Sequence, residues 1–225
     1  RVSAKRSVAR RERPDVVLVG ASTGGTEAVM RLLESMPANC PPILLVQHIS
    51  PYFARAFAQR VAQNSNLRLG VCADGALLES GHVYVADDDR HLGLAGKHGR
   101  LMVLRSDGPP INRHRPSVDF LFRSAAVVPN LKISAVLLTG MGADGAQGMK
   151  ELHDKGAVTY AQDEHSCVVF GMPREAIALG AVDVVAGPMD IRQQLQWQIL
   201  YGVESKERAP TKSRPSAGKG APAAL

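Results

Sequence analysis

The most regular feature of this chain is the alternation of short apolar runs with stretches of helical spacing. Three apolar runs have the length of a strand: 16–19, 43–46 and 133–138, the last interrupted only by Ser134. Each is followed by apolar residues at helical spacing, over about 26–35, 53–63 and 146–155. Fully apolar runs are typical of parallel strands buried on both faces, and the intervening helices supply the crossovers. The pattern predicts an α/β fold with a doubly wound, mostly parallel sheet flanked by helices.

Further elements follow the same rhythm, with one interruption. Helices are predicted over 118–126, from Pro173 onward and over 189–201, and strands over 157–161 and 182–185. Residues 67–104 contain instead four short runs of period 2, separated by Gly or Asp: 69–71, 83–86, 91–94 and 101–104. We interpret these runs as a short antiparallel hairpin excursion at one edge of the sheet.

Length and composition fit one domain of the larger α/β type, with 225 residues and 45% hydrophobic content. No apolar run approaches the roughly 18–20 residues that span a bilayer, and no signal-peptide core follows the basic N-terminus. We therefore expect a cytoplasmic protein without membrane insertion. Cys40, Cys72 and Cys167 lack metal-ligand spacing, which predicts neither a disulfide framework nor a metal site.

The net charge of +6 is concentrated at the ends of the chain. Residues 1–14 carry +5 and residues 203–225 carry +3, which leaves −2 for residues 15–202. A nucleic-acid groove needs basic residues on the folded surface, so we expect no nucleic-acid partner. The composition predicts a basic linker over 1–14, one folded domain over 15–202 and a disordered tail over 203–225.

Three predicted strands end near a serine, a histidine and an aspartate. Ser22 lies in Gly20-Ala21-Ser22-Thr23-Gly24, which matches the G-x-S-x-G elbow of serine hydrolases, although such a loop can also hold a phosphate. His48 ends the next apolar run, where it can activate the Ser22 hydroxyl. Asp144 follows the third run, and it either orients His48 or serves only as the N-cap of the helix at 146–155. The order Ser, His, Asp differs from that of ordinary α/β-hydrolases and predicts a separate fold.

Five segments together resemble the catalytic domain of the chemotaxis methylesterases of the CheB family. They are Gly20–Gly25, Gln47-His48, Asn112–Asp119, Thr139–Gly145 and Phe170–Ala176. The resemblance covers about residues 15–200 and implies that 15–202 is a methylesterase catalytic domain. It implies that Ser22 is the nucleophile, His48 the base and Asp144 the orienting acid, with the backbone around Thr23 and Met141 forming the oxyanion site. No cofactor or metal is implied.

The resemblance also implies the substrate and a partner. Family members hydrolyse glutamate methyl esters on methyl-accepting chemoreceptors, and many deamidate receptor glutamines. Arg113 and Arg115 are candidates for docking an acidic receptor surface, or else they belong to a solvated loop. Most members carry an N-terminal receiver domain, and because nothing of that size precedes Asp15, we expect an excised catalytic fragment or regulation by another partner. A serine esterase acting on a different protein or small-molecule ester, and a noncatalytic phosphate-binding domain, are the alternatives.

Overall fold

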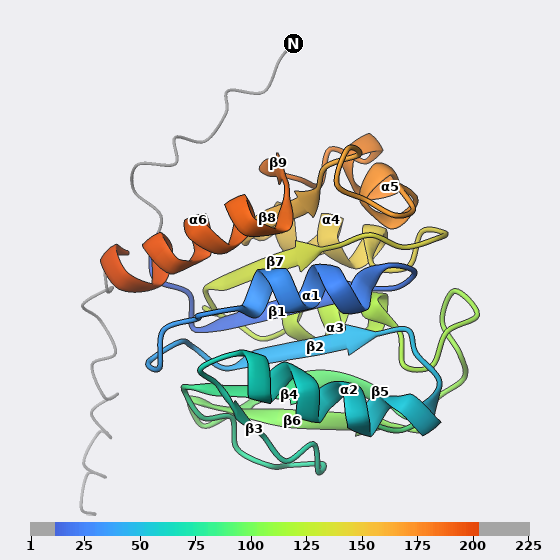
Figure 1. Ribbon diagram of the computed structural model, residues 1–225. Coiled ribbons are helices and arrows are strands. Elements are labelled where there is room, and N and C mark those ends of the chain that lie inside the picture. Colours follow the sequence, from blue (N-terminus) through green and yellow to red (C-terminus); the bar gives the residue numbers. More distant parts are fainter. Residues whose placement is uncertain (1–11, 203–225) are drawn as a thin grey trace, which may run out of the picture.

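A computed structural model of the chain describes residues 12–202 (Figure 1). Its main sheet has seven parallel strands in the order β3-β4-β2-β1-β7-β8-β9. In chain order these strands are β1 (Val16–Ala21), β2 (Ile43–Gln47), β3 (Arg68–Leu69), β4 (His82–Val85), β7 (Ile133–Leu137), β8 (Val158–Gln162) and β9 (Val184–Ala186). The prediction of a doubly wound parallel sheet is confirmed.

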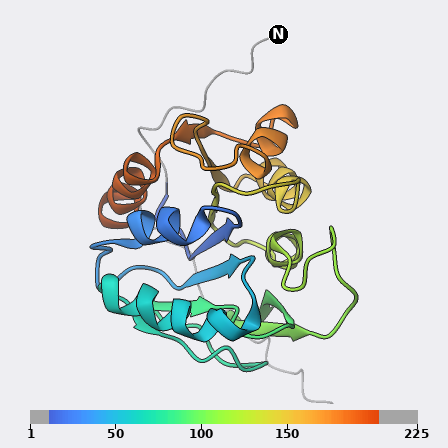
Figure 2. The same cartoon turned by 45° about the vertical axis from the view of Figure 1, so that its right-hand side comes forward.

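Helices cover both faces of this sheet, as Figure 2 shows. One layer contains α1 (Gly25–Leu33), α2 (Pro51–Asn64) and α6 (Pro188–Tyr201). The other contains α3 (Val118–Ala126), α4 (Ala146–Asp154) and α5 (Met172–Ala178). Successive residues of a strand point to opposite faces, so Val17 and Val19 pack under the first layer while Val16 and Leu18 pack under the second. The continuous apolar runs of the sequence reflect these two cores.

The region 67–104 differs in part from its prediction. An antiparallel hairpin is present as a separate two-stranded sheet, β5 (His91–Lys97) and β6 (Arg100–Ser106), which packs against α3. The runs at 69–71 and 83–86 are not part of it, because β3 and β4 join the main sheet in parallel. The antiparallel interpretation of those two runs was wrong, since period-2 alternation marks any half-exposed edge strand and does not fix its direction.

The topology places a switch point at the carboxyl ends of β1 and β7. The chain leaves β1 for α1 on one face, and it leaves β7 for α4 on the other face (Figure 1). Neighbouring loops therefore diverge between these two strands, and ligands of open α/β sheets bind at such a switch point. The ends of β1, β2 and β7 carry Ser22, His48 and Asp144.

The predicted linker and tail are not tested. Residues 1–11 of the linker and the whole of 203–225 lie outside the described residues. Between residues 12 and 202, none of the helices combines the length and the apolar character that crossing a bilayer requires.

Candidate active site

Ser22 lies in a tight turn between β1 and α1. Its amide donates to the carbonyl of Thr139 at 3.0 Å, and its own carbonyl accepts from the amide of Gly25 at 2.8 Å. Gly24 is the N-cap of α1 with φ of +78°, a conformation that glycine adopts at little cost. The segment thus has the strand–turn–helix context that the G-x-S-x-G pattern requires, and it holds a half-buried Ser22 at the mouth of the sheet.

Gln47 connects the Ser22 turn to His48. The buried Gln47 side chain donates from Nε2 to the carbonyl oxygen of Ser22 at 2.8 Å and to that of His48 at 3.1 Å. The His48 amide also donates to the carbonyl of Ala21 at 2.9 Å. These bonds fix the backbone of both residues relative to each other. The sequence analysis noted Gln47 only as part of a motif and gave it no role.

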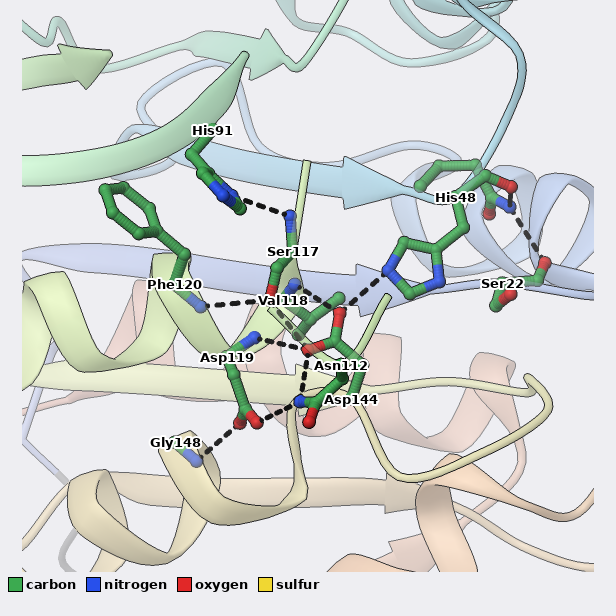
Figure 3. Close-up of polar contacts among 11 residues, drawn as sticks. Ser22, His48, His91, Asn112, Ser117, Val118, Asp119, Phe120, Asp144 and Gly148 are labelled. Carbon is green, nitrogen blue, oxygen red and sulfur yellow. Dashed lines mark hydrogen bonds and ion pairs between the residues drawn. The ribbon is translucent and has the colours of Figure 1, made fainter. Parts of the chain in front are cut away.

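His48 and Asp144 are in direct contact. Nε2 of His48 lies 2.8 Å from Oδ2 of Asp144, and the side chains are only 8% and 1% exposed. The other ring nitrogen, Nδ1, is buried and has no hydrogen-bond partner within residues 12–202. In Figure 3 this nitrogen lies on the side of the ring that faces Ser22. In serine proteases Nε2 faces the serine and Nδ1 the aspartate, so the two ring nitrogens exchange places here.

Asp144 accepts hydrogen bonds from five groups (Figure 3). Oδ2 accepts from Nε2 of His48 and the amide of Val118, and Oδ1 accepts from Oγ of Ser117, Nδ2 of Asn112 and the amide of Asp119, over distances of 2.7 to 3.2 Å. Burial alone would raise the pKa of Asp144, but hydrogen bonds led by the one from His48 outweigh it and lower this pKa to about 2. Asp144 is therefore ionised at neutral pH.

The helix that Asp144 caps is α3 and not α4. The N-cap of α4 is Gly145, with φ of +91° and no side-chain cap, so the alternative in which Asp144 serves only as the N-cap of the helix at 146–155 was wrong. Its carboxylate turns back to the amides of Val118 and Asp119 in the first turn of α3. Turning this way brings the carboxylate to His48, because α3 begins beside the end of β2.

Asp119 makes the reciprocal contact from α3 to α4. Its Oδ1 accepts from the amide of Gly148 in the first turn of α4 at 2.7 Å, and its Oδ2 accepts from Nδ2 of Asn112 at 2.6 Å. Burial and the nearby Asp144 raise the pKa of Asp119, although hydrogen bonds oppose this. The first turn of α4 thus donates to an acid on α3, the first turn of α3 donates to an acid in the loop before α4, and Asn112 bridges the two carboxylates.

Thr23 and Met141 flank Ser22. The amides of both residues are unused by any hydrogen bond in the described part of the chain, and the Met141 side chain is 68% exposed. The Thr139 hydroxyl donates from Oγ1 to the Thr23 carbonyl at 2.9 Å. The same Oγ1 accepts from the amide of Val169. The hydrogen atoms of the Thr23 and Met141 amides are free to serve as donors, and the role of these two amides in an oxyanion site remains a prediction.

Arg113 and Arg115 are placed differently from each other. The Arg115 guanidinium donates to the carbonyls of Asp107 and Gly108 and forms an ion pair with Asp89, each at 3.3 Å. Arg115 therefore stabilises its own loop. Arg113 is exposed beside the site, and its side chain forms no ion pair within the described residues. Of the two candidates, Arg113 is the one whose charge is available to a ligand.

His91 and Cys40 have structural surroundings. His91 is buried, with Nδ1 accepting from the amide of Ser117 and its ring stacked on Phe120. Cys40 is a buried free thiol whose pKa burial raises to about 12. Across residues 12–202, His, Cys, Asp and Glu side chains form no group of three or more suited to a metal ion.

Comparison with known proteins shows the family of this chain. The family model described as CheB methylesterase matches residues 17–195. A protein-glutamate methylesterase/protein-glutamine glutaminase of Pectobacterium atrosepticum is 48% identical over 187 residues, which are 83% of this chain and 53% of the relative. One from Oleidesulfovibrio alaskensis is 50% identical over 81% of this chain and 51% of its own length. The chain spans about half the length of these curated relatives.

A solved structure is also similar. The catalytic domain of the Thermotoga maritima CheB methylesterase is 37% identical and superimposes with a TM-score of 0.77. The match covers 80% of this chain and 96% of that domain.

Proposed function

Because the chain belongs to the CheB methylesterase family, we propose that it is a protein-glutamate methylesterase in which Ser22, His48 and Asp144 form the catalytic triad. The observation that carries this proposal is the contact between His48 Nε2 and the ionised Asp144, with Nδ1 left unpartnered beside Ser22. A base oriented by a carboxylate and adjacent to a serine hydroxyl is the arrangement that activates a serine nucleophile.

Acylation begins at Ser22. His48 Nδ1 takes the hydroxyl proton as Oγ attacks the ester carbonyl, and Asp144 stabilises the resulting imidazolium through Nε2. The tetrahedral oxyanion is stabilised by the amides of Thr23 and Met141. The imidazolium then returns the proton to the departing methoxy group, which leaves as methanol and gives a glutamyl ester on Ser22.

Deacylation repeats the cycle with water. His48 removes a proton from water as its oxygen attacks the glutamyl ester, and the same proton protonates the departing Ser22 oxygen. The product is a glutamate residue of the substrate protein with a free side-chain carboxylate. A glutamine side chain follows the same route with ammonia as the first leaving group, which supports a second activity as a protein-glutamine glutaminase.

The proposed substrate is a methyl-accepting chemoreceptor. A receptor segment that is modified at glutamates presents an acidic surface, and the free charge of Arg113 beside the site is suited to it. We propose residues 15–202 as the catalytic domain, with a receiver domain outside this chain as the regulatory partner and the cytoplasm as its location.

Methanol release from methylated receptor membranes tests the proposal. The assay compares the protein with its Ser22→Ala variant and with Ser80→Ala, a matched control at an exposed serine shortly before β4. We expect release to be lost in Ser22→Ala only. Fluorophosphonate labelling of Ser22 provides a second, substrate-independent measurement.

The outcomes separate the alternatives. Labelling of Ser22 without methanol release indicates a serine esterase for a different ester and refutes the substrate assignment. If Ser22 is not labelled and no methanol is released, catalysis by this site is refuted. That outcome favours a noncatalytic phosphate-binding domain.

A further inference from the structure

A second histidine covers the face of His48. The rings of His114 and His48 are stacked with their centroids 3.7 Å apart and their planes 10° from parallel. Asp144 occupies the Nε2 edge of His48, so His114 closes one of the faces and leaves the Nδ1 edge for Ser22. The sequence analysis considered the segment around His114 only as a docking or solvated loop.

A strained turn presents His114 to His48. The backbones of Ile111 and His114 exchange two hydrogen bonds, of 3.0 and 2.9 Å, around Asn112 and Arg113. The central residues have φ of +51° and +68°, which defines a type I′ turn. This conformation is unfavourable for an arginine, and strain of this kind persists only where the surrounding structure enforces it.

Asn112 is the group that enforces the turn. Its Nδ2 donates to Asp119 at 2.6 Å and to Asp144 at 3.0 Å, so both buried carboxylates hold the first central residue of the turn. One turn therefore contacts the acid through Asn112 and the base through His114. A displacement of the turn moves both contacts together.

The surroundings of His114 favour its neutral form. Burial lowers its pKa, the neighbouring His48 lowers it further, and Asp144 opposes them. On its own segment the charged neighbours are the exposed Arg113 and Arg115, and the guanidinium of Arg115 is paired with Asp89. A neutral imidazole lies against His48 when that ring accepts the proton of Ser22, and the stack persists without charge repulsion.

We propose that His114 is a positioning residue, which keeps the His48 ring in line between Asp144 and Ser22 and keeps water from one face of it. This inference rests on the proposed function, in which His48 is the base. It predicts that activity requires a flat aromatic ring at position 114. It also predicts that activity does not require the imidazole nitrogens of His114.

Two substitutions at this position separate stacking from imidazole chemistry. His114→Phe retains a flat ring, whereas His114→Ala removes it, and His98→Asn at the tip of the β5–β6 hairpin is a matched control at an exposed histidine. We expect His114→Ala to lower kcat by about tenfold or more with little change in KM, because misplacing a reacting group by about 1 Å costs up to ~100-fold. His114→Phe and His98→Asn are expected to retain kcat within about threefold.

The pH profile of kcat/KM provides a readout that a purely structural role would not move. Without the covering ring, water reaches the His48 imidazolium and stabilises it, so the acid limb of the His114→Ala profile moves to higher pH. The acid limb of the His114→Phe profile lies at the same pH as that of the wild type. Thermal unfolding of each variant verifies that it is folded.

Imidazole ¹H–¹⁵N spectra test the inference without any substrate. We expect a single Nε2–H tautomer of His48 in the wild type and in His114→Phe, and a broadened or mixed signal in His114→Ala. An unchanged His48 signal with wild-type kcat in His114→Ala overturns the proposal. The proposal is also overturned if His114→Phe is folded and its kcat falls by as much as that of His114→Ala. If the wild type releases no methanol but the spectra behave as expected, the proposed function fails while the positioning role stands.

Discussion

Replacing Asp144 by asparagine is expected to reduce stability by an amount that depends on pH. The five donors around this carboxylate lower its pKa from 3.8 to about 2. A shift of this size corresponds to about 2 kcal/mol of unfolding free energy, at about 1.4 kcal/mol per pKa unit. Because the folded-state pKa is the lower one, this stabilisation is complete above about pH 5 and is lost as the pH falls toward 2. About 1 kcal/mol of it should be lost between pH 5 and pH 3.

Urea unfolding of the wild type and of Asp144→Asn at several pH values between 5 and 3 measures this contribution. Subtracting the two curves removes the titration of the carboxyl groups that do not interact with Asp144; Asp119 does interact with it, so Asp119→Asn is measured alongside. The difference in unfolding free energy should shrink by about 1 kcal/mol over the window. Glu164→Gln, at an exposed glutamate, is the control and should show a constant difference from the wild type. A constant difference for Asp144→Asn would refute the idea that the ionised carboxylate holds the start of α3.

Three further substitutions have expected outcomes in the methanol-release assay. Gln47→Ala removes the bonds to the carbonyls of Ser22 and His48, so kcat should fall by about tenfold or more while circular dichroism stays unchanged. Gly140→Ala places a Cβ 2.6 Å from the Cβ of Ser22, so it should displace the nucleophile and abolish both release and fluorophosphonate labelling. Arg113→Ala should raise KM about fivefold with kcat unchanged, because an exposed charge at the rim contributes to docking and not to the chemical step; an equal fall in kcat would exclude that role.

The sequence predicted the sheet because its central strands are apolar on both faces. The same runs placed Ser22 and His48 correctly at adjacent strand ends. The edge strand β3 and its neighbour β4 were misassigned because β3 is exposed and only two residues long, so no continuous apolar run distinguishes it. Period alone does not encode the direction in which such a short strand pairs.

The details of the site depend on contacts that local patterns do not encode. Asp144 looked like the cap of the helix that follows it, whereas its partners lie 25 to 32 residues earlier on α3 and the turn before it, and 96 residues earlier at His48. The stacking of His114 depends on a type I′ turn with an arginine at positive φ, which sequence preference argues against. Tertiary contacts from Asn112 override that preference.

The exchange of caps between α3 and α4 has a consequence for how the site can evolve and be engineered. Asp144 reaches the base only from a turn whose amide partners are on α3, and α3 in turn supplies the acid that starts α4. The acid therefore cannot be transplanted as a single residue, nor with α4 alone. A transferable unit must include the chain from Ile111 through Gly148. A shorter graft removes the helix amides that donate to the buried carboxylates, and a buried carboxylate without donors is strongly destabilising.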